Sequence, residues 1–476
     1  MFDSARSVAA APHLAPGPVQ NTARRGRART AAQDPMMALP AVLISALLFF
    51  QLFDYQALEL FRFLKVLFTV TPDRLVFLIM SAGFLWSFVN GRVRSASFGV
   101  IEVCMLLFAS LCTVSWFVTG PDASLQRFKW LTTLFNFVFL PFGLYLITKN
   151  ASYFRTKAAV VLRTIVAIGV YLSLTATFEH YGMNALIWPK YIMDPRVGIQ
   201  WGRSRGPFVG SNPMGEWLIV VFLATCLLMQ FVRTPWRLLL QALVPLTVAG
   251  IYFTDTRGVW LGFAAVLAIG SARGRKFGVQ FRLVVFLLLI AFVVGMGSKF
   301  SLGEDTLFTR RQNTVDYRIS NFQTAINMGL ANPVTGVGYG NFGATWGEYF
   351  GQEERQLAND LTDGNHNTYL GLFAELGFPG LFLYLALLTS LARECVTVRK
   401  HLGPTDDFER YFSLSALGVL SVAMIEALFG DLRFDPTLNA LLFLFLGVTA
   451  SMRHGARNEG TRLSSETGGR NAGRSD

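Results

Sequence analysis

The chain is too apolar for an ordinary soluble protein. Of its 476 residues, 52% are hydrophobic and 15% are charged, whereas soluble domains carry about 25% charged residues. The net charge of +12 would suggest nucleic-acid binding in a soluble chain. Here the positive residues cluster between apolar runs, where they orient membrane helices. We therefore expect an all-α integral membrane protein with no nucleic-acid partner.

The four cysteines predict neither a disulfide framework nor a metal site. They lie in or beside apolar runs without ligand spacing, at Cys104, Cys112, Cys226 and Cys395. We interpret them as packing residues.

Both ends of the chain are polar. Residues 1–36 are basic, with RRGRAR from Arg24 to Arg29, and the apolar run that follows has no signal-peptide cleavage site. We expect a disordered cytoplasmic tail at 1–36, a polytopic membrane domain at 37–451, and a second polar tail at 452–476.

Apolar runs predict about twelve membrane-spanning helices, although several runs are shorter than the roughly 20 residues that cross the hydrocarbon core. The predicted spans are centred on residues 38–53, 74–90, 97–117, 128–147, 158–177, 213–232, 238–253, 258–272, 281–297, 368–390, 411–429 and 437–451. The amphipathic segment Leu58–Phe68 fits a helix along the interface instead.

Positive charge orients these spans, because cytoplasmic loops carry the excess of Lys and Arg. With the N-terminus inside, every inner loop is basic, at positions that include Arg92, Lys149, Arg233, Arg275 and Arg399. The cations that depart from this pattern are Arg62, Lys65, Arg127 and Lys129. An even number of spans returns the C-terminus to the cytoplasm and leaves outer loops at 180–213, 254–258 and 298–367.

The outer loop TDTRG is very short. The apolar runs beside it, Leu238–Phe253 and Val259–Ala272, are each shorter than a full crossing, so Arg257 is expected at or below the outer interface. A charge at that depth is costly unless it faces a cavity, a partner or a ligand. Arg257 is therefore a candidate anion-binding residue. The alternatives are contact with lipid headgroups or a pair with Asp255.

The outer loop 180–213 contains RSRGPFVGSNP. Arg203 fits a contact with lipid phosphate, whereas Arg205 fits either that contact or a binding site. Glu216, just inside the next apolar run, is either a buried partner of one of these cations or a site residue.

The long outer loop before the tenth span, residues 298–367, is predicted to be partly helical. Its apolar spacing predicts a helix at 317–328 with Arg318 near its start, an Asn-Pro pair ends that helix, and glycines follow. GYGNFG at 338–343 has the letters of the dinucleotide motif, but that motif needs a preceding strand and a following helix. We interpret it as a glycine-rich turn packed closely against the membrane domain.

His366 lies at the end of this loop, just before a predicted membrane helix, and is flanked by Asp363, Asn365 and Asn367. A histidine with an ordinary pKa of about 6.5 accepts or donates a proton at neutral pH. The alternative is a helix-capping cluster in which the histidine is a bystander.

Together, several of these motifs resemble the O-antigen ligase and polymerase superfamily, multi-spanning bacterial glycosyltransferases related to the GT-C class. They cover roughly the second half of the chain, with RSRGPFVGSNP at 203–213, TDTRG at 254–258, YRISNFQTAINMGLANPVTGVGYGNF at 317–342 and GNHNTYLGLFAELGFPGLF at 364–382. The first half of the chain offers no recognisable motif.

The resemblance implies a donor glycan attached through diphosphate to a polyprenyl lipid, at the periplasmic face of the inner membrane. It implies that Arg205 and Arg257 bind the diphosphate, that His366 acts near the acceptor hydroxyl, and that Arg318 is a recurrent arginine with a less defined role. The acceptor would be a lipid A core sugar in a ligase, or another repeat unit of O-antigen or exopolysaccharide in a polymerase. Membrane lipids and other polysaccharide assembly proteins are the further partners expected.

The residues fit this chemistry independently of the resemblance. Guanidinium groups make bidentate hydrogen bonds to phosphate and stabilise an anionic leaving group. The outer loops contain no DxD-like acidic pair, so we expect no metal and no other cofactor. The rival function is a transporter or flippase of a lipid-linked or anionic solute. Against it, no internal repeat and no pair of broken helices relate the two halves of the sequence.

Overall fold

The computed structural model describes residues 35–53, 71–91, 98–119, 130–150, 154–273, 305–349, 365–402 and 406–452, and within these ranges it contains helices and no strand. The chain divides into two compact units, residues 1–40 and 41–476. Apart from the first residues of α2, all described helices belong to the second unit.

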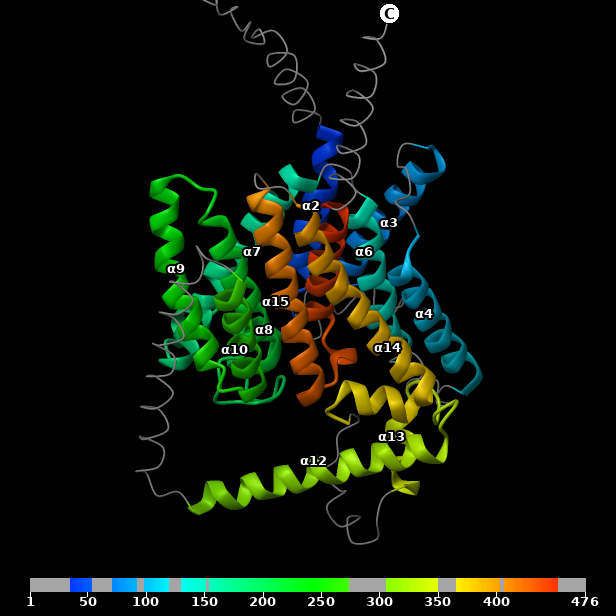
Figure 1. Cartoon of the computed structure of the whole chain (residues 1–476). Helices are drawn as coiled ribbons and strands as arrows, with labels where there is room; N and C mark the ends of the chain where they lie inside the picture. The colour runs from blue at the N-terminus through cyan, green and yellow to red at the C-terminus, as the bar shows by residue number, and fades with distance from the viewer. Residues whose placement is uncertain are drawn as a thin grey trace, which may run out of the picture. The chain divides into compact units, whose positions relative to one another are not determined.

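Helices of the length and composition of membrane spans make up most of this unit (Figure 1). The long ones are α3 (Pro72–Val89), α4 (Val100–Thr119), Trp130–Asn150, α7 (Phe154–His180), α8 (Ser211–Leu228), α9 (Thr234–Phe253), α14 (Thr368–His401) and α15 (Asp407–Phe429). The shorter apolar ones are α2 (Pro35–Phe50), α10 (Arg257–Arg273) and Pro436–Met452. The all-helical membrane class is thereby confirmed.

Each predicted span outside 281–297 coincides with one of these helices. The span at 281–297 and the interfacial segment at 58–68 lie outside the described residues. The total of twelve spans therefore stays a prediction.

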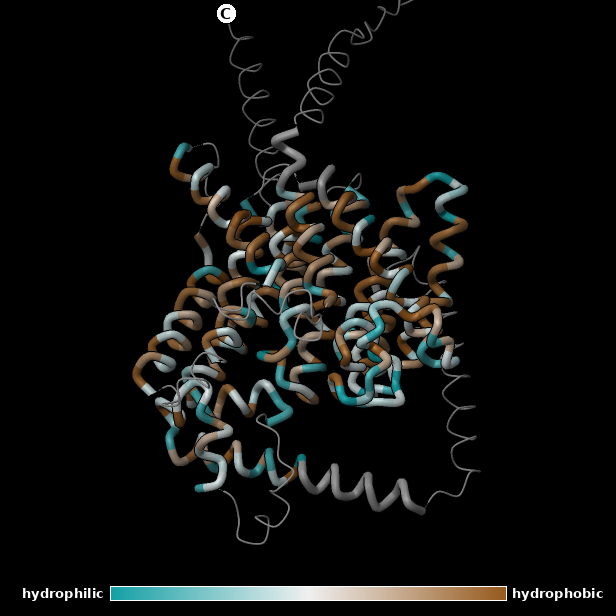
Figure 2. Tube along the Cα trace, turned by 180° about the vertical axis from the view of Figure 1, so that it is seen from behind, coloured by the Kyte–Doolittle hydropathy of each residue, from teal (hydrophilic) through white to brown (hydrophobic). Residues whose placement is uncertain are grey.

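Burial separates the helices of the core from those that face lipid. In α8, 89% of the apolar window is buried, whereas the figure is 17% in α3 and 22% in α9. In a membrane, apolar side chains that are not buried in protein can contact lipid tails, which are equally apolar. Figure 2 shows hydrophobic residues along the helices of the bundle. The predicted packing role of the four cysteines is confirmed, because all four are buried and free.

Two helices of the bundle depart from regular α geometry. Trp130–Asn150 contains a π-helical turn, η2 (Phe135–Phe139), before α6 (Leu140–Asn150). In α14, Gly377 adopts φ 66° and ψ −164°, two residues before Pro379. Such a backbone suits glycine, and it lets the Phe378 N–H donate to the Pro333 carbonyl at 2.8 Å.

The long loop before α14 contains α12 (Asp305–Ala331), which is longer than the predicted helix at 317–328. Figure 1 shows α12 beyond one end of the bundle. Its C-terminal part packs on α14 through a small apolar cluster of Ala325, Met328, Phe342 and Ala374.

The glycine-rich turn at 336–343 packs against the bundle as predicted. The N–H groups of Val337 and Gly338 donate to the carbonyls of Ala374 and Glu375 at 2.9 and 3.0 Å. A Cβ added at Gly338, where φ is +101°, would lie 2.3 Å from Thr119 Oγ1 of α4. The turn therefore requires glycine for close approach, and no dinucleotide fold surrounds it in the described part of the chain.

Candidate functional site

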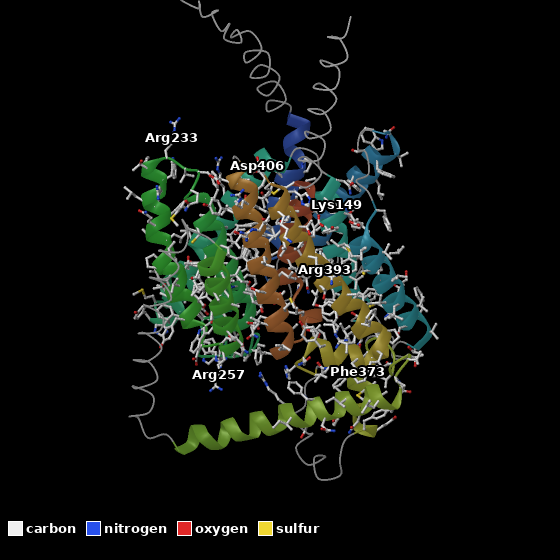
Figure 3. All side chains as sticks on the ribbon, in the orientation of Figure 1. Lys149, Arg233, Arg257, Phe373, Arg393 and Asp406 are labelled. Atoms are coloured by element: carbon white, nitrogen blue, oxygen red, sulfur yellow. The ribbon has the colours of Figure 1, made fainter. Side chains whose placement is uncertain are left out.

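Two of the motifs that carry predicted site residues lie at one end of the bundle. Figure 3 shows Arg257, at the start of α10, and Phe373, near the start of α14, at the end that lies toward α12. Lys149, Arg233 and Asp406 lie at the opposite end. The two motifs that contain Arg257 and His366 therefore share one end of the molecule.

His366 occupies an unusual backbone conformation. Its φ is +54°, a left-handed value that few residues other than glycine adopt. The side chain is half-buried. Burial lowers the pKa of His366, the positive charge of Arg318 lowers it further, and the carboxylate of Asp431 opposes both. The imidazole is thus held in its neutral form at pH 7, the form that accepts a proton.

The residues beside His366 anchor it to the end of α15. Asn367 caps α14 by accepting from Leu370 N at 3.0 Å, and its amide donates to the Leu428 carbonyl at 3.1 Å. Thr368 donates to the Gly430 carbonyl from its N–H and its hydroxyl, at 3.2 and 3.1 Å. The predicted helix cap is thus present, and it holds the histidine segment against Leu428–Gly430.

Asn365 is fully buried, and its Oδ1 accepts from Asn367 N at 2.9 Å. Its Nδ2 has no hydrogen-bond partner among the described residues. Asp363, the other predicted neighbour of His366, lies outside them.

The residue after Arg257, Gly258, packs against the last turn of α15. Arg257 is exposed at the first position of α10, and a Cβ added at Gly258 would lie 2.9 Å from Glu426 Oε2 of α15. Gly430 N donates to the Glu426 carbonyl at 2.8 Å. The start of α10 and the histidine segment therefore both contact the last turn of α15.

Arg318 lies on α12 with its side chain exposed. Its positive charge lowers the pKa of His366. A cation from the long loop thus acts electrostatically on the candidate base.

Arg205 is buried, and its guanidinium donates hydrogen bonds to backbone carbonyl groups. It donates to the carbonyls of Ile192, Asp194, Val197 and Ile199 at 2.8, 3.3, 2.7 and 3.3 Å. The Arg205 backbone N–H donates to the Glu179 carboxylate at 3.1 Å. Arg205 thus fixes the conformation of loop 180–210, and its side chain is 1% exposed.

Loop 180–210 is in turn joined to the TDTRG turn. Ser211 Oγ lies 2.8 Å from Thr256 Oγ1, and Ser204 N donates to the Phe253 carbonyl at 3.1 Å. The two arginine motifs found in the sequence are therefore adjacent, and Arg205 supports the turn that carries Arg257.

Glu216 has carboxyl groups as neighbours. The carboxyl groups of Asp435 and Glu426 act on it electrostatically, and no described hydrogen bond or ion pair joins it to Arg203 or Arg205. Among the described residues, no group of three or more His, Cys, Asp or Glu side chains is arranged to hold a metal ion.

A buried ionic cluster near His366 was not found by the sequence analysis. Arg433, on η9 (Leu432–Phe434), pairs with Glu375 of α14 and with Asp431, where Arg433 Nε lies 2.9 Å from Asp431 Oδ1. The signal that could have found it is a charge within or beside apolar sequence, which is rare unless paired or functional. Only the fold shows which residues are paired.

These features define a class, a multi-pass helical membrane protein with histidine and arginine side chains gathered at the ends of its helices. Residues 242–385 match the family model described as O-Antigen ligase. This match, over less than half of the chain, confirms the resemblance to the O-antigen ligase and polymerase superfamily. The matched residues run from α9 into α14 and include Arg257, Arg318 and His366. No curated protein matches the chain.

Proposed function

We propose that the protein is an inner-membrane glycosyltransferase that moves a glycan from a polyprenyl diphosphate lipid to an acceptor hydroxyl at the periplasmic face. The observation that carries the proposal is that the neighbours of His366 and Arg257, Asn367 and Gly258, both contact the last turn of α15, while His366 and Arg257 both lie in the residues that match the O-Antigen ligase model. This transfer needs a neutral base to accept the proton of the acceptor hydroxyl and positively charged side chains to bind the diphosphate.

In the proposed mechanism, the acceptor oxygen attacks the anomeric carbon of the donor sugar. His366 accepts the proton of the acceptor hydroxyl, and the bond from sugar to diphosphate breaks as the new glycosidic bond forms. The diphosphate leaves with the bonding electrons. Arg257 and Arg318 stabilise its negative charge through charge-assisted hydrogen bonds.

The remaining predicted residues have supporting roles in this proposal. Arg205, predicted as a diphosphate ligand, acts instead through the loop that it holds against the TDTRG turn. Asn365 and Asn367 position His366, and Asp363 and Glu216 stay candidates for supporting residues. The reaction as proposed uses no metal and no cofactor.

The orientation in the membrane follows from the positive charges. The predicted inner loops that contain Lys149 and Arg233 lie at the end opposite Arg257. Because basic loops stay in the cytoplasm, Arg257 and His366 would face the periplasm, with both termini cytoplasmic.

The position of the site favours an enzyme over a transporter, because transporters bind substrate near the bilayer midplane and Arg257 lies at a helix end. Purified protein in liposomes, supplied with a polyprenyl diphosphate-linked glycan and an acceptor, should release free lipid diphosphate. Movement of the intact lipid-linked glycan without release would instead support the transporter.

The ligase and polymerase variants use the same residues and differ in the acceptor. We favour the ligase, in which lipid A core sugar receives the glycan. Offering lipid A core and lipid-linked repeat units in separate reactions decides between them. Product on lipid A core alone supports the ligase, and chain extension of the repeat unit alone supports a polymerase.

A further inference from the structure

We propose that Arg433 is a positioning residue of this transfer reaction, which locks the glycine-rich turn and the His366 segment into one rigid unit through Glu375 and Asp431. This inference rests on the proposed function for its catalytic meaning. The contacts of Arg433 by themselves support its role in holding the two segments together.

Arg433 reaches three elements that are distant in sequence. Its guanidinium pairs with Glu375 of α14 and with Asp431 of its own segment. It also lies over the Trp130 ring, at 5.2 Å from the centroid, and over the Tyr339 ring at 5.8 Å. The side chain is 1% exposed, so all of these contacts are shielded from water and weakly screened.

Glu375 connects Arg433 to the glycine-rich turn through hydrogen bonds. Besides Arg433, it accepts from the backbone N–H groups of Gly340 and Phe342 at 2.8 and 3.3 Å. Removing the Arg433 charge leaves this buried carboxylate without its cation. A buried carboxylate without a cation favours its protonated form, which weakens its bonds to the two N–H groups.

The segment that contains His366, residues 365–371, also lies close to Arg433. A Cβ added at Gly371 would lie 2.9 Å from both Arg433 Nη2 and Asn365 Nδ2. The guanidinium and the residue before His366 therefore converge on one glycine of α14. Thr368 Oγ1 completes the contact by accepting from Leu432 N at 2.9 Å.

Asp431 links the cluster to the histidine electrostatically. Its two carboxylate oxygens accept hydrogen bonds from Arg433 Nε at 2.9 and 3.1 Å. Its negative charge raises the pKa of His366. Arg433 thus fixes where the Asp431 carboxylate stands relative to the imidazole. Lysine keeps the charge but lacks the planar fork that serves two carboxylates at once.

Hydrogen exchange tests the structural part without any substrate. We expect Arg433→Gln to increase backbone exchange at 336–342 and 365–371. Lys149→Gln is the matched control, because Lys149 forms a similarly buried ion pair with Glu102 at the opposite end of the bundle. If exchange in both segments is the same in Arg433→Gln and Lys149→Gln, the positioning role is refuted. Arg433→Lys provides the same comparison if Arg433→Gln does not fold.

Transfer kinetics test the catalytic part. Normalised to folded protein, Arg433→Gln should lower kcat by about 100-fold, the typical effect of small misplacement, with the donor KM changed less than threefold. Arg433→Lys should recover part of kcat, and Lys149→Gln should keep wild-type kcat. A normal kcat in Arg433→Gln overturns the catalytic role. Absence of transfer by the wild-type protein overturns the proposed function instead, while the exchange result still decides whether Arg433 positions the segments.

Discussion

At the scale of single residues, His366 combines features expected of a general base. The imidazole is held neutral by burial and by Arg318, and its left-handed backbone is fixed by bonds on both sides. Strain of this kind persists where the surroundings determine it, and it concentrates at functional sites.

The pH dependence of turnover should move in opposite directions when the two charges near His366 are removed. A general base works above its own pKa, so the acid limb of kcat should lie below the ordinary histidine pKa of about 6.5. Asp431→Asn removes the charge that raises the pKa of His366 and should shift the acid limb to lower pH. Arg318→Gln removes a charge that lowers it and should shift the limb to higher pH. Shifts of the same sign, or none, would contradict the assignment of His366.

Arg257 and Arg205 should respond differently to substitution. Arg257→Ala should weaken donor binding by about 10- to 100-fold, because a charged hydrogen bond contributes roughly 1.5–3 kcal/mol, and thermal stability should stay near that of the wild type. Arg205→Lys should mainly lower thermal stability, because lysine cannot serve the carbonyls that the guanidinium holds. Donor titrations and melting curves check both. A stable Arg205→Lys protein with lost donor affinity would return Arg205 to the diphosphate.

The sequence predicted these residues unevenly, for a physical reason. Arg257 and His366 stand out locally, since each is a polar group at the end of an apolar run. The partners Glu375 and Arg433 are 58 positions apart, and their pairing depends on how α14 and η9 pack. No local pattern contains that information.

At the scale of elements, the glycine-rich turn is the connection between the long loop and the bundle. Its positive φ angles and its contacts with α4 and α14 leave no room for a Cβ. The sequence predicted this turn, because glycines at short spacing after an Asn-Pro pair have few other uses. It did not predict the π turn at 135–139 or the full length of α12, which tertiary packing sets.

Adding a methyl group to this turn should destabilise the protein. Gly338→Ala would force a Cβ to 2.3 Å from Thr119 Oγ1 at a φ of +101°, a strain of about 1–3 kcal/mol. Gly83→Ala in α3 is the matched control, because nothing lies within 4 Å of its Cβ, and alanine favours a helix by about 0.5–1 kcal/mol. Melting temperatures of the two variants in detergent check this. Equal melting temperatures would show that the turn is not closely packed in solution.

At the scale of the whole molecule, a periplasmic reaction requires the end of the bundle that carries Arg257 to face away from the cytoplasm. Hydropathy predicted the positions of the described helices well, because a membrane crossing leaves few choices of length and composition. The distribution of Lys and Arg between the two ends predicts their orientation.

Labelling of single cysteines in cells should show the predicted orientation. In a background without the four native cysteines, Arg257→Cys should react with an impermeant thiol reagent added from outside the inner membrane. Arg233→Cys should react only after the membrane is opened. The reverse pattern would place His366 in the cytoplasm and remove the proposed periplasmic reaction.

The most direct test of the central claim is release of free polyprenyl diphosphate by protein in liposomes, followed together with transfer of the glycan. The wild-type protein should release one lipid diphosphate for each glycan transferred, and His366→Ala should lower that rate by about 100-fold or more, as expected for loss of a general base. Full turnover in His366→Ala would exclude the histidine as the base. Transfer of the glycan across the membrane without release would contradict the glycosyltransferase itself.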